Sequence, residues 1–287
     1  MPSAADAGTI TIGGDLTVNR LGFGAMRITG GDGGVWGYPP DPDAARALLR
    51  RVVELDVTFV DTADSYGPDV SERLIGEALA PYPEGVVVAT KGGFLRDGPG
   101  SWRPDGRPEH LRGACEGSLA RLGLERIDVY QLHTPDPAVP IEESLGALAD
   151  LRREGKIRHV GVSNVDVDEL ERARSVVDVV SVQNRYSLSD REHEDVLDAC
   201  ERLEVAFIPW YPLARGRLAA EESLERIAGE KSATPAQISL AWLLRRSPVM
   251  LPIPGTSSEA HLEENVSAAA LELTDGELQE LAELGVA

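Results

Sequence analysis

Four ionisable residues lie at the ends of three apolar segments of this chain, and together they are suited to give a proton to a carbonyl oxygen. Asp61 and Tyr66 end the first segment, Lys91 directly follows the second, and His133 follows the third. A tyrosine phenol, with a pKa of about 10, releases its proton reluctantly at neutral pH. A neighbouring lysine lowers that pKa by stabilising the phenolate, and an aspartate holds the lysine charged and in place. We therefore predict that these residues converge on one site, in which the imidazole orients the carbonyl.

Such a site requires strands whose carboxyl ends lie side by side, and the chain alternates short apolar runs with amphipathic segments of helical spacing. The apolar runs that we predict as strands span 20–24, 57–61, 86–90, 127–132, 157–162, 179–183, 205–210 and 249–253. The amphipathic segments that we predict as helices span 41–55, 70–80, 108–122, 141–153, 166–175, 190–202, 234–246 and 257–268. Eight strands, each followed by a helix, predict a (β/α)8 TIM barrel, an α/β fold that forms a single domain over residues 1–287.

Short elements are predicted at the two ends of the chain. A β-hairpin is predicted at 9–18, and Thr274 is predicted to cap a short C-terminal helix. Alternation alone also fits an open, doubly wound sheet that binds a dinucleotide. That fold would need a third glycine after Gly22 and Gly24, but Arg27 stands at this position and no helix follows directly. We therefore favour the barrel.

Composition argues against several other classes of protein. The formal net charge of −20 over 287 residues disfavours binding to nucleic acid or to an anionic membrane surface, because both would repel the chain. Cys115 and Cys200 have no CxxC spacing, and the five histidines form no HxH or HExxH motif, so neither a disulfide framework nor a metal-dependent hydrolase is indicated. The sequence shows no signal-peptide pattern and no apolar run near the roughly 18 residues of a membrane helix. We expect a cytoplasmic monomer that needs no metal.

A series of motifs follows the same order as the predicted strands: LGFGAM, FVDTADSYG, VVVATKGG, DVYQLH, GKIRHVGVSN, SVQNRYS, FIPWYPLARGR and PIPGTSSEAHLEEN. Through these motifs the sequence, from about Leu21 to Asn265, resembles the aldo-keto reductase family. The resemblance implies a barrel that binds NADP(H) in an extended form without a Rossmann fold and reduces aldehydes or ketones to alcohols. The alternative is a cofactor-bound regulatory or sensor subunit with little turnover, as in channel-associated members of the family. The lack of an obvious docking extension weighs against that alternative.

The resemblance also implies a role for each residue of the predicted site. Tyr66 donates the proton, Lys91 lowers the pKa of the phenol, and Asp61 pairs with Lys91. His133 hydrogen-bonds the substrate oxygen. The residues implied to bind the cofactor are Gly24, Ala25, Met26, Asp61, Ser163, Asn164, Gln183, Trp210, Tyr211, Pro212, Leu213, Arg215, Gly216, Arg217, Gly255, Thr256, Ser257, Ser258, His261, Glu264 and Asn265.

Different members of this set are implied to bind different parts of the cofactor. Ser163, Asn164 and Gln183 bind the nicotinamide carboxamide, and Trp210 stacks on the nicotinamide ring. The loop implied to cover the pyrophosphate contains Leu213, Arg215, Gly216 and Arg217. The residues implied to surround the adenosine half are Thr256, Ser257, Ser258, His261, Glu264 and Asn265.

One departure from the family pattern concerns the 2′-phosphate of NADPH. Many members carry a lysine and then an arginine that bind this group, whereas this chain has Gly255 and His261 at the corresponding positions. Thr256, with Glu259 three residues later, predicts a capping box whose helix N-terminus and neighbouring hydroxyls attract an anion. We therefore expect a narrower preference for NADPH than in members with the two basic residues, with NADH as the alternative cofactor.

Two long connections, at 27–40 and 92–107, follow predicted strands, and each contains a tryptophan. Long loops within a compact fold are usually functional or mobile. The loops of a barrel meet at the carboxyl ends of its strands. We therefore expect Trp36 and Trp102 to contact a small-molecule carbonyl substrate.

Overall fold

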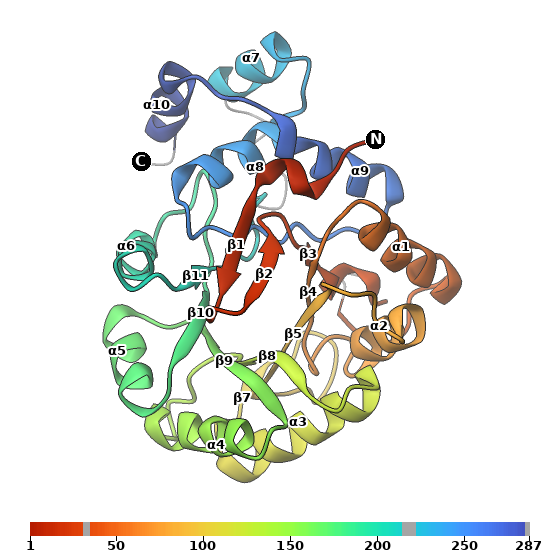
Figure 1. Cartoon of the computed structure of the whole chain (residues 1–287), viewed down its shortest axis with the longest axis vertical. Helices are drawn as coiled ribbons and strands as arrows, with labels where there is room; N and C mark the ends of the chain where they lie inside the picture. The colour runs from red at the N-terminus through yellow and green to blue at the C-terminus, as the bar shows by residue number, and fades with distance from the viewer. Residues whose placement is uncertain (31–34, 214–221, 285–287) are drawn as a thin grey trace.

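The structure, a computed structural model, describes residues 1–30, 35–213 and 222–284. Its main sheet is parallel and curls into a barrel, with strands in the order β11-β10-β9-β8-β5-β4-β3 (Figure 1). These strands are β3 (Phe23–Gly24), β4 (Phe59–Asp61), β5 (Val87–Gly92), β8 (Ile127–Leu132), β9 (Ile157–Ser163), β10 (Val179–Gln183) and β11 (Ala206–Phe207). The (β/α)8 barrel predicted from the alternation of apolar and amphipathic segments is confirmed.

The eighth side of the barrel is the segment 249–253, where we predicted a strand but the structure has no regular one. The segment nevertheless bonds to both edges of the sheet. The Phe207 amide donates to the Val249 carbonyl at 2.8 Å, and the Gly22 amide donates to the Pro252 carbonyl at 2.9 Å. Proline has no amide hydrogen, so Pro252 cannot donate to the ladder of a regular strand. These bonds close the barrel at a seam between β11 and β3.

Helices pack on the outside of the sheet, close to the predicted positions. They are α1 (Pro42–Glu54), α2 (Val70–Leu79), α3 (Pro108–Leu122), α4 (Ile141–Arg153), α5 (Val167–Val176), α6 (Glu194–Leu203), α8 (Pro235–Arg246) and α9 (Glu259–Ser267). The predicted caps Asp41 and Thr234 accept hydrogen bonds from backbone amides in the first turns of α1 and α8. α6 begins at Glu194 rather than at residue 190, because Ser187 and Asp190 pair in a turn before the helix.

The start of α9 differs from the prediction. Ser258 is its N-cap, and the Ser258 hydroxyl accepts from the His261 amide at 3.4 Å. The Thr256 hydroxyl instead accepts from the Ser258 amide at 3.0 Å. The predicted capping box between Thr256 and Glu259 is therefore wrong, because Thr256 forms a separate turn before the helix begins.

Two further helices lie side by side next to the C-terminal part of the barrel (Figure 1). α10 (Asp275–Glu283) begins at the predicted cap Thr274. α7 (Glu222–Glu230) was not predicted, because it precedes α8 without an intervening strand and so falls outside the alternation. Arg226 of α7 and Glu280 of α10 form an ion pair at 2.5 Å.

The predicted N-terminal hairpin covers the amino-terminal end of the barrel. Its strands, β1 (Thr9–Ile12) and β2 (Leu16–Asn19), pair antiparallel and lie across that end in Figure 1. Asp15, in the turn between them, forms an ion pair at 2.7 Å with Arg158 near the start of β9. The carboxyl ends of the strands are therefore the end of the barrel at which a ligand can enter.

Short elements occupy several connections. β6 (Phe94–Leu95) and β7 (Arg103–Pro104) form a small antiparallel pair in the long connection after β5. 3-10 helices span Ala4–Ala7, Ala25–Ile28 and Ala268–Ala270. The second of these directly follows β3, so the chain turns at the carboxyl end of that strand.

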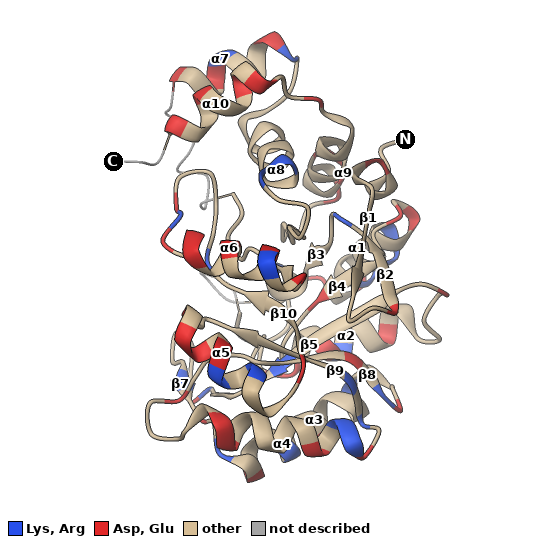
Figure 2. Ribbon diagram, turned by 60° about the vertical axis from the view of Figure 1, so that its left-hand side comes forward, with Lys and Arg blue, Asp and Glu red and all other residues tan. Residues whose placement is uncertain are grey.

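Apolar side chains form one layer inside the barrel and another between the sheet and the helices. Phe59, Val87 and Val129 point into the barrel, where Ile12 of the hairpin packs with them. Charged residues lie mainly on the outer helices and loops (Figure 2). Among the helices formed by the described residues, none is both long and apolar enough to cross a membrane.

Candidate active site

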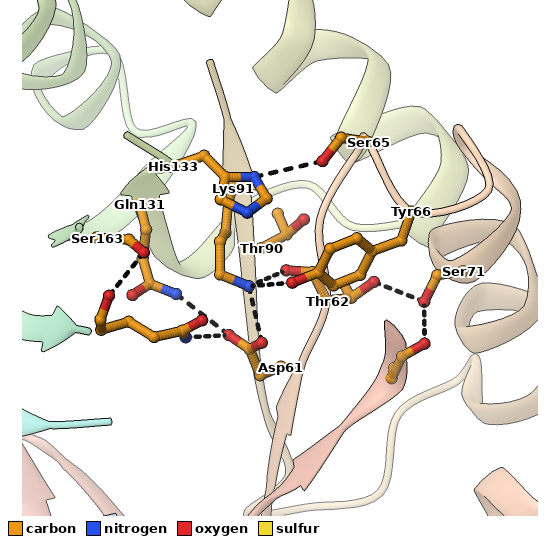
Figure 3. A network of polar contacts seen from close by, with 12 residues as sticks. Asp61, Thr62, Ser65, Tyr66, Ser71, Thr90, Lys91, Gln131, His133 and Ser163 are labelled. Carbon is orange, nitrogen blue, oxygen red and sulfur yellow. Dashed lines mark hydrogen bonds and ion pairs between the residues drawn. The ribbon is translucent and has the colours of Figure 1, made fainter. Parts of the chain in front are cut away.

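The four ionisable residues predicted to converge do come together at the carboxyl ends of β4, β5 and β8 (Figure 3). Asp61 ends β4, Lys91 lies in β5, and His133 directly follows β8. Tyr66 lies in the turn after β4, and its hydroxyl points toward the Lys91 ammonium. At most 7% of the surface of any of these residues is exposed. A buried lysine and a buried aspartate are rare unless they are paired.

The Lys91 ammonium is fully engaged by its neighbours. Its Nζ lies 2.7 Å from Asp61 Oδ2, 2.8 Å from the Thr62 carbonyl oxygen and 3.4 Å from the Tyr66 hydroxyl. An ammonium has three hydrogens to donate, so these partners account for all of them. The longest of the three contacts is the one to the phenol, which leaves the Tyr66 hydroxyl available to another acceptor.

The Asp61 carboxylate is held from its other side by two glutamine side chains. Gln183 Nε2 donates to Asp61 Oδ1 at 2.8 Å, and Gln131 Nε2 donates to the same oxygen at 3.3 Å. A buried ion pair is tolerated only when its remaining hydrogen-bonding groups are satisfied. Gln131 was missed by sequence reasoning, although a polar residue inside the apolar run 127–132 was the available signal. The two glutamines hold the Asp61 carboxylate in place, and this carboxylate in turn holds the Lys91 ammonium.

Burial dominates the ionisation of the phenol. It raises the pKa of Tyr66 above its usual value, and the nearby Lys91 charge opposes this rise without cancelling it. Lys91 therefore acts in the predicted direction, but the expectation of a lowered phenol pKa is not met. Burial also acts to lower the pKa of the Lys91 ammonium, yet Asp61 and Tyr66 raise it beyond its usual value. At neutral pH the site thus holds a protonated phenol beside a charged ammonium.

His133 is held in its neutral form. Burial lowers the pKa of the imidazole well below its usual value, and the charges of Lys91 and Arg96 lower it further. Its Nδ1 lies 3.3 Å from the Ser65 hydroxyl, which fixes the orientation of the ring. A neutral imidazole has one donor and one acceptor nitrogen, so it can hydrogen-bond a substrate oxygen without competing as an acid.

The lowered pKa of His133 predicts a loss of stability in mild acid. Below a pH of about 6.5, the histidine of the unfolded chain binds a proton that the folded chain does not bind. The free energy of unfolding therefore falls by up to about 1.36 kcal/mol for each pH unit. We expect the unfolding free energy to fall by roughly 1–2 kcal/mol more in the wild type than in His133→Gln between pH 6.5 and 5. Urea unfolding at both pH values measures the difference, and equal falls in the two proteins would contradict it.

An aromatic wall borders the four converging residues. The ring centroids of Phe94 and Trp102 lie 4.7 Å and 6.3 Å from that of His133, and the Trp102 centroid lies 6.4 Å from that of Tyr66. Trp102 therefore stands where we expected a substrate-contacting residue. Trp36 does not line the cavity, and the centre of its ring lies 5.5 Å from the Arg96 guanidinium. Phe94 was missed, although an aromatic residue in the long connection 92–107 was the available signal.

Arg96 joins this wall to two other connections, and sequence reasoning missed it as well. Its guanidinium lies 3.7 Å from the centre of the Trp102 ring. The same group donates to the Ser65 carbonyl at 2.6 Å and to the Val35 carbonyl at 3.3 Å. Ser65 precedes Tyr66 and contacts His133, so Arg96 positions both the aromatic wall and the proton-donating turn.

We expect Arg96→Met to raise KM for a carbonyl substrate by roughly tenfold, because a cation–π contact and two hydrogen bonds that hold the wall are lost. The Kd of NADPH should stay within about twofold, since Arg96 lies on the substrate side of the site. Arg103→Met is the matched control, because Arg103 lies in β7, in the same connection as Arg96, and its side chain is 59% exposed. Steady-state kinetics measure the effect, and an unchanged KM would show that Arg96 does not position the wall.

A cavity of about 740 Å³ is lined both by Asp61, Tyr66 and His133 and by residues at the start of α9. The predicted cofactor-binding residues that line it are Gly24, Met26, Asp61, Ser163, Asn164, Gln183, Trp210, Tyr211, Pro212, Leu213, Gly255, Thr256, Ser257 and His261. Those that the structure describes but that do not line it are Ala25, Ser258, Glu264 and Asn265. Arg215, Gly216 and Arg217 lie outside the described residues. Lining residues that were not predicted as site residues are Arg27, Phe94, Ile253 and Pro254.

Hydrogen bonds connect the catalytic end of the cavity to its middle. The Asn164 amide group donates to the His133 carbonyl at 2.9 Å, and the Trp210 indole donates to Asn164 Oδ1 at 3.0 Å. The Ser163 hydroxyl donates to the Gln183 carbonyl at 2.7 Å. Asn164 has a φ of 59°, a left-handed conformation that asparagine adopts more readily than most residues. Amide and hydroxyl groups are thus placed beside the half-buried Trp210 ring.

The cavity fits an extended nicotinamide dinucleotide. Its volume lies in the range of small-molecule and cofactor sites. Its lining includes the Tyr66 phenol and the His133 imidazole, the Trp210 ring with its neighbouring amides, and the residues Thr256 and Ser257, which carry hydroxyls. These groups are suited to a reacting ring, an amide and an anionic nucleotide end.

Comparison with known proteins identifies the relatives of the chain. The sequence model of the Aldo/keto reductase family matches residues 20–285. An uncharacterized oxidoreductase of Schizosaccharomyces pombe is 50% identical over 283 residues, which is 98% of this chain and 91% of that protein. Pyridoxine 4-dehydrogenase of Escherichia coli is 40% identical, covering 95% of this chain and 96% of that protein. A crystal structure of an aldo-keto reductase from Klebsiella pneumoniae in complex with NADPH superposes with a TM-score of 0.83 at 27% identity, covering 99% and 95% of the two chains.

Proposed function

The chain belongs to the aldo/keto reductase family and is an NAD(P)H-dependent enzyme that acts on carbonyl groups, and from this premise we propose that it reduces aromatic aldehydes with NADPH, using Tyr66 as the proton donor. The observation that carries the proposal is the buried contact of Tyr66 with the Lys91–Asp61 pair beside an aromatic wall. The phenol is protonated, the ammonium is charged and the imidazole is neutral. Each group is in the state that the reduction of a carbonyl requires.

In the proposed reaction, Ser163, Asn164 and Gln183 would hold a nicotinamide cofactor, which when bound would supply a hydride for the carbonyl carbon. Tyr66 gives its hydroxyl proton to the carbonyl oxygen as negative charge develops there, and the alcohol is formed. Lys91 stabilises the phenolate that remains, and Asp61 keeps Lys91 charged. His133 donates a hydrogen bond to the same oxygen and so sets its direction. Because these groups are already fixed and largely dry, little reorganisation is needed during the reaction.

The proposed substrate class follows from the wall that faces the catalytic residues. Phe94 and Trp102 present flat apolar surfaces, and their rings meet those of Tyr66 and His133 edge to face. Aromatic pairs of this kind gain about 0.5–1.5 kcal/mol beyond simple burial, so a planar ring is favoured over a flexible chain. The relative named pyridoxine 4-dehydrogenase carries the name of a substituted pyridine alcohol, which supports the same class.

A substrate panel followed by NADPH absorbance tests the proposal. The panel contains benzaldehyde, pyridine carboxaldehydes and pyridoxal, together with straight-chain aldehydes of equal carbon number, sugar aldehydes and ketones. We expect kcat/KM for the aromatic aldehydes to exceed that for the straight-chain ones by about tenfold. Equal values would reject the aromatic class. Tight NADPH binding without oxidation by any member of the panel would instead support a regulatory or sensor subunit.

A further inference from the structure

Two glycines that line the cavity, Gly24 and Gly255, come together beside the seam of the barrel. A Cβ atom on Gly255 would lie 2.6 Å from the Gly24 carbonyl oxygen, and one on Gly24 would lie 2.7 Å from the Ile253 carbonyl oxygen. Both obstacles are backbone atoms, which cannot swing away as a flexible side chain can. No side chain therefore fits at residue 255 without moving the seam, and this is the position at which many family members carry a phosphate-binding lysine.

A different cation occupies the space beside this seam. Arg27 lies in the 3-10 turn that follows β3, lines the cavity and is exposed. Its Cγ lies 3.6 Å from the point where a Gly255 side chain would begin. Within the described part of the chain, its guanidinium forms no hydrogen bond or ion pair with another residue. In a chain with 48 acidic and 28 basic residues, a cation left without a carboxylate partner at a cavity is available to a ligand.

The groups around Arg27 are suited to an anion rather than to a neutral sugar. Thr256, Ser257 and His261 line the same end of the cavity. The Thr256 oxygen accepts a hydrogen bond from the Ser258 amide, so its hydroxyl hydrogen remains free to donate. A guanidinium can form two parallel hydrogen bonds to a phosphate, which gives it an advantage over an ammonium for this group.

We propose that Arg27 binds the 2′-phosphate of NADPH and sets the preference for NADPH over NADH, in place of the lysine that the Gly24–Gly255 seam excludes. The inference rests on the proposed use of NADPH. It predicts that selectivity depends on a residue at the start of the barrel, in the first βα connection, rather than on residue 255. A cation that contacted the pyrophosphate would serve NADH and NADPH equally, and this difference makes the proposal testable.

The test measures the Kd of NADP⁺, NAD⁺ and 2′,5′-ADP for the wild type, Arg27→Gln and Arg50→Gln by quenching of tryptophan fluorescence. The Kd of 2′,5′-ADP is measured by its competition with bound NADP⁺. This compound carries the 2′-phosphate without a pyrophosphate or nicotinamide. We expect Arg27→Gln to weaken NADP⁺ and 2′,5′-ADP by about 10- to 100-fold and to change NAD⁺ by less than about twofold. Arg50 is an exposed residue of α1 outside the cavity, so Arg50→Gln controls for the loss of one positive charge.

Two results would overturn the proposal without touching the proposed function. If Arg27→Gln weakened the binding of NADP⁺ and NAD⁺ equally, Arg27 would contact the pyrophosphate instead. If NADP⁺ binding were unchanged, Arg27 would not contact the cofactor. Wild-type protein that binds neither dinucleotide and oxidises no NADPH would overturn the proposed function together with this inference. Circular dichroism of each variant confirms that the fold is kept.

Discussion

Tyr66→Phe is expected to lower kcat for aldehyde reduction by about 10²- to 10⁴-fold, the usual contribution of a positioned general acid. The substitution removes only the hydroxyl, which accepts a hydrogen bond from Lys91 at 3.4 Å. The Kd of NADPH should remain within about twofold, because the hydroxyl acts in the chemical step and the ring is kept. Single-turnover oxidation of bound NADPH measures the loss directly.

Tyr82→Phe is the matched control for this substitution. The Tyr82 hydroxyl donates to the Leu122 carbonyl at 2.7 Å, far from the cavity lining, so its loss should reduce stability by about 1 kcal/mol and leave kcat unchanged. Because burial raises the pKa of Tyr66, the wild-type rate should decline only as pH rises above about 10, where the phenol begins to lose the proton it must donate. A near wild-type rate in Tyr66→Phe would exclude Tyr66 as the acid.

Lys91→Met is expected to reduce both catalysis and stability. The substitution leaves the Asp61 carboxylate buried without its cation, and breaking a buried pair in this way costs about 3–5 kcal/mol of unfolding free energy. It also removes the charge that stabilises the phenolate, so we expect kcat to fall by at least about 10²-fold. Urea unfolding and steady-state kinetics on the same preparation measure the two effects.

The double variant Lys91→Met/Asp61→Asn separates the two roles of the lysine. Removing the second charge relieves the unpaired carboxylate, while the asparagine oxygen can still accept from Gln131 and Gln183. We expect more than half of the lost stability to return and the rate to stay low. A double variant as unstable as the single one would show that the pair is not the source of the stability loss, and recovery of the rate would show that Lys91 has no catalytic role.

Much of the barrel and the core of the site could be predicted because the relevant signals are local in sequence. Short apolar runs separated by helical spacing specify strands and helices, and a polar residue at the end of such a run has no structural reason to be there. Asp61, Lys91 and His133 were found in this way, and the rule that chemistry gathers at the carboxyl ends of barrel strands brought them together. Geometry confirms that convergence.

Residues that act through contacts between distant segments were missed. Arg96 bonds to backbone carbonyls of Ser65 and Val35, which lie 31 and 61 residues away in sequence. Gln131 reaches an aspartate 70 residues away. Nothing in the local pattern around either residue specifies these partners, because carbonyl oxygens occur at every position of every chain. Sequence reasoning noted Arg27 only because it stands where a dinucleotide-binding motif would need a third glycine.

By itself, the sequence of this protein determined the order of strands and helices, the chemical types at the strand ends and the family to which they belong. The tertiary structure alone decided that the eighth strand is an irregular seam, that α9 begins at Ser258 and that the phenol pKa is raised rather than lowered. The physical reason is the range of the forces involved. Periodicity and capping act over a few residues, whereas burial and close backbone approach depend on segments that meet only when the barrel closes.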